Sequence, residues 1–117
     1  MEIKFTIEFY KRPNNKYPFR EYLEKQTKKT KDKILAYLQN LAVIQSFRQE
    51  PYSRQLKDKL RELKIEAEGR AHRVLYFMII GRKIIILNAF LKKTKKTPKS
   101  EIVRALRYMN DYLSRCK

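Results

Sequence analysis

The sequence predicts an α+β fold, a small antiparallel-centred sheet with two helices from the N-terminal half and one from the C-terminal end. Residues 3–9 alternate apolar and polar side chains, which is typical of a strand with one buried face. Apolar residues recur at helical spacing over 34–47 and again over 102–113. Between those stretches, residues 73–91 are rich in Val, Ile and aromatic side chains, as buried strands are.

The N-terminal half is expected to contain one strand followed by two helices. After the strand, Asn14 and Asn15 mark a loop, and Pro18 stands where the first turn of a short helix tolerates proline. Thr30 is a suitable N-terminal cap for a second, longer helix that ends near Phe47. The lysines within 28–33 fit a solvated charged surface better than a catalytic site.

Three strands are expected in the C-terminal half. Residues 62–66 alternate apolar and charged side chains and predict the first of them. The runs 73–80 and 83–91 are separated by Gly81 and Arg82, so they predict an antiparallel hairpin at the centre of the sheet.

A closing helix follows the last strand. Thr97 and Pro98 supply an N-terminal cap and a first-turn proline. The apolar side chains expected to pack on the sheet are Ile102, Leu106, Met109 and Leu113. The element order is therefore strand, two helices, three strands and helix, in one domain that spans 1–117.

The composition indicates a folded protein with an acidic partner. The chain carries 29 Lys and Arg residues against 12 acidic residues, a formal net charge of +17. Because 43% of the residues are hydrophobic, we expect a folded core rather than a disordered chain. A folded chain with this charge attracts polyanions, and we favour nucleic acid over a membrane surface or a merely soluble basic protein.

Neither a membrane span nor a secretion signal is expected. The apolar stretch 74–91 is interrupted by Gly81, Arg82 and Lys83, and each half is far shorter than the roughly 20 residues that a spanning helix needs. The first residues lack the basic and then apolar layout of a secretion signal. Cys116 has no second cysteine to pair with, so we expect a cytoplasmic protein in which it is an inert thiol.

A lysine-rich loop connects the last strand to the closing helix. Its four lysines are Lys92, Lys93, Lys95 and Lys96. The loop leads into a helix N-terminus, where free backbone N–H groups and the helix dipole favour an anion. A loop that only increases solubility has a similar composition, but this position favours phosphate binding.

Three segments resemble a known family. They are 62–65, 72–77 and 89–102, and the pattern Phe-x-Lys-Lys-Thr-x-Lys-Thr-Pro leading into Glu-Ile is distinctive. They are similar to the phage-derived Gp49-like branch of HigB toxins, within the RelE/ParE superfamily. The resemblance covers about 60–113, and the N-terminal half shares only the strand-helix-helix layout.

The resemblance implies a RelE-like fold and a toxin that cleaves messenger RNA in the decoding site of the ribosome. Such toxins use no metal or other cofactor: the ribose 2′-hydroxyl attacks the adjacent phosphate and leaves a 2′,3′-cyclic phosphate and a free 5′-hydroxyl. The implied partners are the ribosome, messenger RNA and a HigA-like helix-turn-helix antitoxin.

Site residues follow from the same resemblance. Arg73 matches an arginine that opens a strand, and its planar fork suits two phosphate oxygens. Lys64 matches a basic strand residue, and neighbouring cations would lower its pKa enough for a general base. Lys93 and Lys96 are further catalytic candidates, for phosphate contact or for the proton of the 5′-oxygen. The RNA-binding candidates are Lys92, Lys95, Lys99, Arg70 and Tyr108.

The histidine and the aromatic residues need separate interpretation. His72 titrates near neutrality, but strand neighbours point to opposite faces, so His72 should point away from RNA if Arg73 faces it. Many relatives carry histidine where this chain has Asn88, which leaves the proton-transfer residues open. Tyr76 and Phe77 are expected in the core. Tyr108 is expected to lie off the apolar stripe of its helix, where it can stack on a base or act as an acid.

Two other functions fit the same sequence. A ParE-like toxin has this fold but inhibits gyrase and cleaves no RNA. A non-catalytic RNA-binding module would need the same basic surface without an activated base. The concentration of lysines beside Arg73 favours the nuclease.

Overall fold

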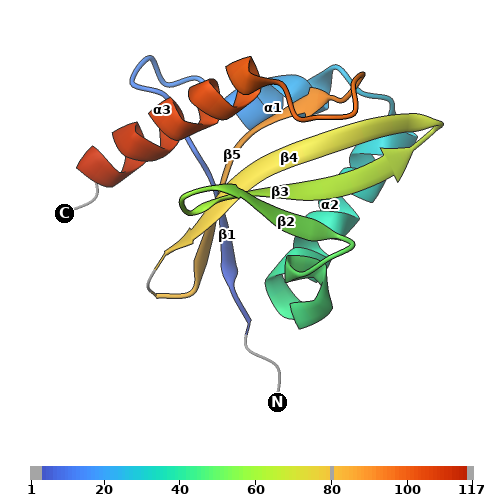
Figure 1. The fold of residues 1–117 in the computed structure, drawn as a ribbon, viewed down its shortest axis with the longest axis horizontal. Helices are drawn as coiled ribbons and strands as arrows, with labels where there is room; N and C mark the ends of the chain where they lie inside the picture. Colours follow the sequence, from blue (N-terminus) through green and yellow to red (C-terminus); the bar gives the residue numbers. More distant parts are fainter. Residues whose placement is uncertain (1–3, 80, 116–117) are drawn as a thin grey trace.

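The computed structural model describes residues 4–79 and 81–115, so the predictions for Ile3, Ile80 and Cys116 fall outside it. The described chain forms a five-stranded sheet with helices on both faces, which confirms the α+β prediction (Figure 1). The elements in chain order are β1 (Thr6–Phe9), α1 (Pro18–Glu24), α2 (Lys28–Val43), a short 3-10 helix (Gln45–Arg48), β2 (Ser53–Lys57), β3 (Leu60–Ala67), β4 (Arg70–Ile79), β5 (Lys83–Leu91) and α3 (Lys99–Arg115).

The strands lie in the order β1-β5-β4-β3-β2. All neighbours are antiparallel except β1, which runs parallel to β5. The β4–β5 pair turns through Gly81 and Arg82, which both have positive φ angles of 95° and 61°, so the predicted central hairpin is confirmed. In the described part of the chain, no helix is both long and apolar enough to cross a membrane.

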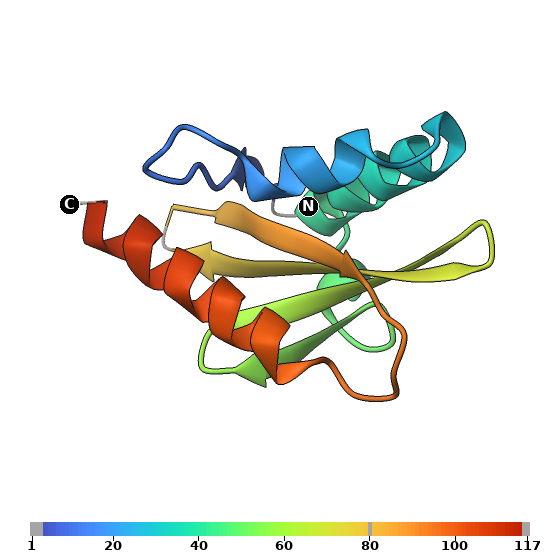
Figure 2. The same ribbon diagram turned by 90° about the horizontal axis from the view of Figure 1, so that it is seen from above.

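Helices cover both faces of the sheet (Figure 2), and an apolar core lies on each face. On one face, α1 and α2 cover inward residues of the central strands, among them Leu63, Val74, Tyr76 and Ile84. On the other face, α3 covers the alternate residues, among them Leu60, Leu75, Phe77 and Ile85. Because side chains of a strand alternate between faces, each polar residue of the central strands belongs to one of these two sides.

The structure adds one strand to the predicted order. β2 is an edge strand whose sequence is Ser-Arg-Gln-Leu-Lys, with Ser53 as its one fully buried side chain. An edge strand with so few apolar residues carries almost none of the period-two signal on which sequence prediction depends. Its pairing with β3 sets Arg54 opposite Glu62.

Two predicted helix caps are wrong. α2 begins at Lys28, and Thr27 caps it by accepting a 3.2 Å hydrogen bond from the Thr30 backbone N–H. α3 begins at Lys99, and the Pro98 carbonyl accepts the first backbone bonds of that helix. The Thr97 hydroxyl instead donates to Glu62 on β3. In both cases the threonine predicted as a cap donates its hydroxyl to a carboxylate distant in sequence. Thr30 donates to Glu68, and Thr97 donates to Glu62.

The packed face of α3 confirms the prediction for Ile102, Leu106 and Met109, whereas Leu113 was predicted wrongly. Its buried residues are Ala105, Tyr108, Met109 and Tyr112, whereas Leu113 is exposed. Tyr108 stacks on Tyr10, with ring centroids 4.9 Å apart. The tyrosine rings of this helix therefore contribute more to the core than we expected from its aliphatic residues alone.

The turn between β3 and β4 is tied to the start of α2. The Glu68 carboxylate accepts hydrogen bonds from the hydroxyls of Thr27 and Thr30, the second at 2.6 Å. These bonds, with smaller contributions from Lys29 and Arg70, lower the pKa of Glu68. A folded-state pKa below the unfolded value gives a stabilisation that is complete above the unfolded pKa and is lost as the pH falls through the folded pKa.

The Glu68→Gln variant should therefore unfold a few degrees below the parent protein at neutral pH, and the difference should close in acid. Circular dichroism at the two pH values measures both midpoints. Glu24→Gln, at an exposed position of α1, serves as the control and should match the parent throughout. A difference that persists in acid would contradict the role given to the carboxylate.

Candidate active site

Polar side chains gather on the α3-covered face of the sheet, close to where the chain enters α3. We call this group the cationic site and define it by Arg54, Glu62, Lys64, Arg73, Lys92 and Thr97. Strand alternation sets Glu62 and Lys64 on the side of Leu60, and Arg73 on the side of Leu75. Register then aligns β2 and β3, so Arg54 meets Glu62 across the pair.

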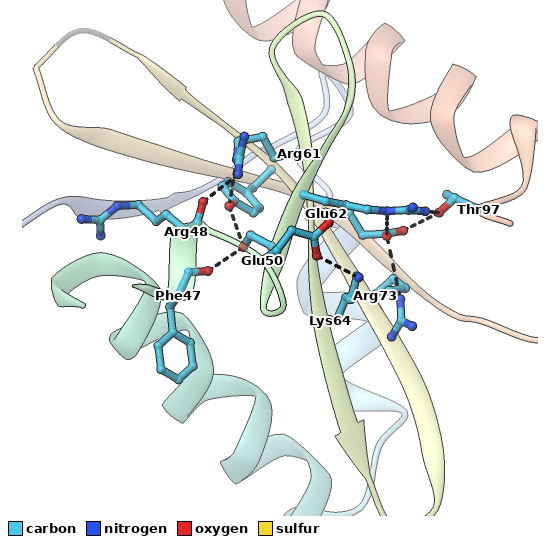
Figure 3. A network of polar contacts seen from close by, with 11 residues as sticks. Phe47, Arg48, Glu50, Arg61, Glu62, Lys64, Arg73 and Thr97 are labelled. Atoms are coloured by element: carbon cyan, nitrogen blue, oxygen red, sulfur yellow. Dashed lines mark hydrogen bonds and ion pairs between the residues drawn. The ribbon is translucent and has the colours of Figure 1, made fainter. Parts of the chain in front are cut away.

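Glu62 is the centre of the site, and sequence reasoning missed it. Its side chain is 0% exposed, and its two oxygens have different partners. Oε2 accepts a 2.5 Å hydrogen bond from the Thr97 hydroxyl, and Oε1 accepts a 3.0 Å bond from Arg54 Nε (Figure 3). Arg54 Nη2 also reaches Thr97 Oγ1 at 3.3 Å, which closes the ring. This ring anchors the lysine loop to the sheet.

Arg73 lies beside this ring but is held more loosely by it. It is 8% exposed, and its Nη1 donates a 3.0 Å bond to the His72 carbonyl. Its Nε lies 3.9 Å from Glu62 Oε1 and has no hydrogen-bond partner among the described residues. Glu62 therefore offsets the charge of Arg73 without accepting a hydrogen bond from its Nε–H, and among the described residues this donor has no acceptor.

Two lysines extend the cationic site. Lys64 Nζ forms a 3.2 Å ion pair with Glu50, an exposed residue after the 3-10 helix (Figure 3). The Lys92 backbone N–H donates to the Ala71 carbonyl at 2.8 Å, so Lys92 continues the β4–β5 pairing. Burial and then the Arg73 guanidinium lower the pKa of Lys92, with Arg54 and Lys64 acting in the same direction and Glu62 against them.

The remaining lysines of the loop are exposed beside this site. They are Lys93, Lys95 and Lys96, followed by Lys99 in the first turn of α3. Thr94 donates a 2.7 Å bond to the Lys96 carbonyl, which shapes the loop, and Thr97 fixes its end to Glu62. The structure thus brings Arg73, Lys64 and Lys92 together and leaves the other lysines at the solvent-facing margin.

Arg70 and His72 lie on the opposite face of β4. They line a pocket of about 290 Å³ with Lys25, Gln26, Thr27, Thr30 and Glu68. His72 is 1% exposed, and its Nδ1 lies 2.6 Å from the Tyr22 hydroxyl. Burial and then Arg70 lower the pKa of His72, and burial raises the pKa of Tyr22 to about 12. The prediction that His72 points away from Arg73 is confirmed, whereas Arg70 lies apart from the cationic site.

The aromatic predictions have mixed outcomes. Tyr76 and Phe77 are fully buried, as expected. Tyr108 is 8% exposed within the core, so its predicted position off the apolar face is wrong, and we do not include it in the site. Tyr108 follows the buried Ala105 by three residues, on the same side of α3, and stacks on Tyr10.

Asn88 on β5 is a further polar residue on the α3-covered face of the sheet. It is 3% exposed, and its Nδ2 reaches Glu101 Oε1 at 3.5 Å. Its Oδ1 has no hydrogen-bond partner among the described residues. The described chain also contains no group of three His, Cys, Asp or Glu side chains placed to hold a metal ion.

The comparisons with known proteins identify the family. The chain matches the family model described as phage derived protein Gp49-like (DUF891) over residues 21–110. That segment runs from α1 into α3 and includes the whole cationic site. No curated protein matches the sequence. The chain belongs to the phage-derived Gp49-like family.

Proposed function

We propose that this protein is a HigB-like toxin that cleaves messenger RNA on the ribosome and so inhibits translation. The observation that supports this best is Arg73, whose buried Nε–H lies 3.9 Å from Glu62 and has no hydrogen-bond partner in the described part of the chain. A buried N–H donor without an acceptor costs free energy unless a ligand supplies the acceptor. The phosphodiester of RNA is an anion of suitable shape for the planar fork.

The proposed reaction transfers a phosphoryl group within the RNA. The ribose 2′-oxygen forms a bond to phosphorus while the bond from phosphorus to the 5′-oxygen of the next nucleotide breaks. The products are a 2′,3′-cyclic phosphate and a 5′-hydroxyl, so one proton leaves the 2′-hydroxyl and one reaches the 5′-oxygen. Negative charge on the non-bridging oxygens grows in the transition state, and side-chain cations stabilise it.

Three residues of the cationic site fit these tasks. Arg73 binds the non-bridging oxygens. Lys92, whose lowered pKa makes it a stronger acid than an ordinary lysine, protonates the leaving 5′-oxygen. Lys64 is the base proposed for the 2′-hydroxyl, and RNA must first displace Glu50 from it. Lys93, Lys95, Lys96 and Lys99 bind flanking phosphates.

The proposed partners follow from this reaction. A ribosome would present the messenger in the geometry that in-line attack requires. A helix-turn-helix antitoxin of the HigA kind would neutralise the toxin with acidic groups or a helix over the cationic site. Counter-ion release should make RNA binding strongly salt-dependent.

Incubation with translating ribosomes tests the function directly. We expect cleaved messenger whose 5′ fragments end in 2′,3′-cyclic phosphate. Intact messenger together with inhibited DNA supercoiling would show a gyrase-directed toxin instead. Intact messenger with tight RNA binding would show a non-catalytic RNA-binding module.

The pH dependence of cleavage tests the role of Lys92. Only the protonated amine can donate, so the rate should fall at alkaline pH from a point below the ordinary lysine value of 10.5, because the pKa of Lys92 is lowered. Arginine stays charged at these pH values, so Lys92→Arg should remove that alkaline fall and slow cleavage by about 10²-fold. Lys57→Arg, at an exposed position of β2, is the control for the general effect of replacing lysine by arginine. An alkaline fall that survives in Lys92→Arg would exclude Lys92 as the acid.

A further inference from the structure

Among residues 4–79 and 81–115, two buried side-chain atoms without hydrogen-bond partners face the same side of the sheet. They are the Nε–H of Arg73 on β4 and the Oδ1 of Asn88 on β5. Arg73 pairs with Phe90, and Asn88 pairs with Leu75, so the two residues are diagonal neighbours on the α3-covered face. Side chains in that relation are close enough to contact one group between them.

The two atoms have complementary chemistry. Arg73 offers a charged donor, whereas Asn88 offers a neutral acceptor. The amide is oriented by Glu101, because its Nδ2 lies against that carboxylate and the reverse orientation would set oxygen against oxygen. A ligand that satisfies both atoms combines an anionic oxygen with a hydrogen-bond donor such as a hydroxyl. Adjacent phosphate and ribose 2′-hydroxyl groups supply this combination in RNA, and DNA lacks the hydroxyl.

We propose that Asn88 is a specificity residue that selects RNA over DNA. Its Oδ1 accepts the hydrogen of a ribose 2′-hydroxyl next to the phosphate that Arg73 binds. This inference rests on the proposed function, because it uses the same site and substrate. A hydroxyl rotates about its C–O bond, so its bond to Asn88 on binding and its later transfer of a proton are successive steps.

RNA can reach the amide only after a side chain that covers it moves. Both Arg73 Nε and Asn88 Oδ1 are covered in the free protein. Glu101 contacts Asn88 Nδ2 and Arg104 Nη1 at 3.5 Å each, the long limit of a hydrogen bond.

Binding to matched oligonucleotides tests the proposal. The probes are one single-stranded RNA, its fully 2′-O-methylated form, which keeps the ribose shape but has no hydroxyl donor, and the DNA of the same sequence. The parent protein should bind the RNA about fivefold more tightly than either analogue, as expected for one hydrogen bond that otherwise leaves a buried acceptor unpaired. Asn88→Leu, of similar shape, should reduce this preference to near unity while its affinity for DNA stays within a factor of about two.

The matched control is Asn110→Leu, at an exposed position of α3, which should keep the preference of the parent. Asn88→Ala repeats the test with a smaller side chain if the leucine variant fails to fold. The proposal is overturned if the parent shows no preference, if both Asn88 variants keep it, or if they weaken RNA and DNA binding equally. Messenger that stays intact on ribosomes while the preference is present would refute the nuclease but leave the specificity role standing.

Discussion

Replacing Arg73 by glutamine is expected to lower the rate of RNA cleavage by about 10²- to 10³-fold, as the loss of one preorganised donor to a developing oxyanion does. Glutamine keeps a polar side chain of moderate length but removes the charge and the planar fork. Because the donors of Arg73 are proposed to act on charge that grows in the transition state, kcat should fall more than KM rises. Single-turnover cleavage of ribosome-bound messenger measures the rate of the chemical step.

The exposed arginine of α3, Arg107, provides the matched control. Arg107→Gln makes the same exchange outside the cationic site and should cleave at the parental rate. Arg73→Lys separates charge from geometry, since lysine keeps the charge but binds one oxygen at a time. Cleavage by Arg73→Gln within a factor of about three of the parent would remove Arg73 from the mechanism, because a catalytic donor contributes far more.

Truncation of Glu62 is expected to cost the most stability of any substitution in the site. Glu62→Ala removes a fully buried carboxylate from Arg54, Arg73 and Thr97 and leaves buried positive charge uncompensated. Breaking a buried ion pair in this way costs about 3 kcal/mol or more of the free energy of unfolding. Urea unfolding at fixed pH and salt measures the loss.

Two companion measurements identify the source of that loss. Thr97→Val removes a hydroxyl that donates to Glu62 and accepts from Arg54. It should cost about 2 kcal/mol, because it leaves an oxygen of the buried carboxylate unpaired. Sulfate should stabilise Glu62→Ala more than it stabilises the parent, because the anion can replace the missing carboxylate. Equal stabilisation of both proteins by sulfate would argue that Glu62 packs there without holding the cations.

The parts of the fold that could be predicted from sequence are those with a strong local signal. The β4–β5 hairpin combines long apolar runs with Gly81, and α2 repeats its apolar residues at helical spacing. β2 could not be predicted because its residues are mostly polar and its existence depends on pairing with β3. Thr97 has the local sequence of a helix cap, but a carboxylate 35 residues away determines its actual bond.

In the candidate site, too, the features with a local sequence signal could be predicted and those that depend on tertiary contacts could not. Strand alternation correctly separated His72 from Arg73, and the same rule applied to Arg70 would have placed it with His72. Glu62 had no comparable signal, since alternation over 62–66 marks it simply as the polar neighbour of Leu63. Its importance arises from three segments that meet only in the folded chain, namely β2, β3 and the loop before α3.

The buried carboxylate at the centre of the site also determines how the molecule behaves before it meets a ligand. The buried Glu62 carboxylate acts as an internal counter-ion of the site, and its Oε1 accepts a 3.0 Å hydrogen bond from Arg54 Nε. The charge left for an incoming polyanion is then concentrated on Arg73, Lys92 and the exposed lysines. An inhibitor would therefore gain little by matching the full +17 of the chain. A pair of carboxylates placed at Arg73 and Lys92 would compete with RNA where the attraction is strongest.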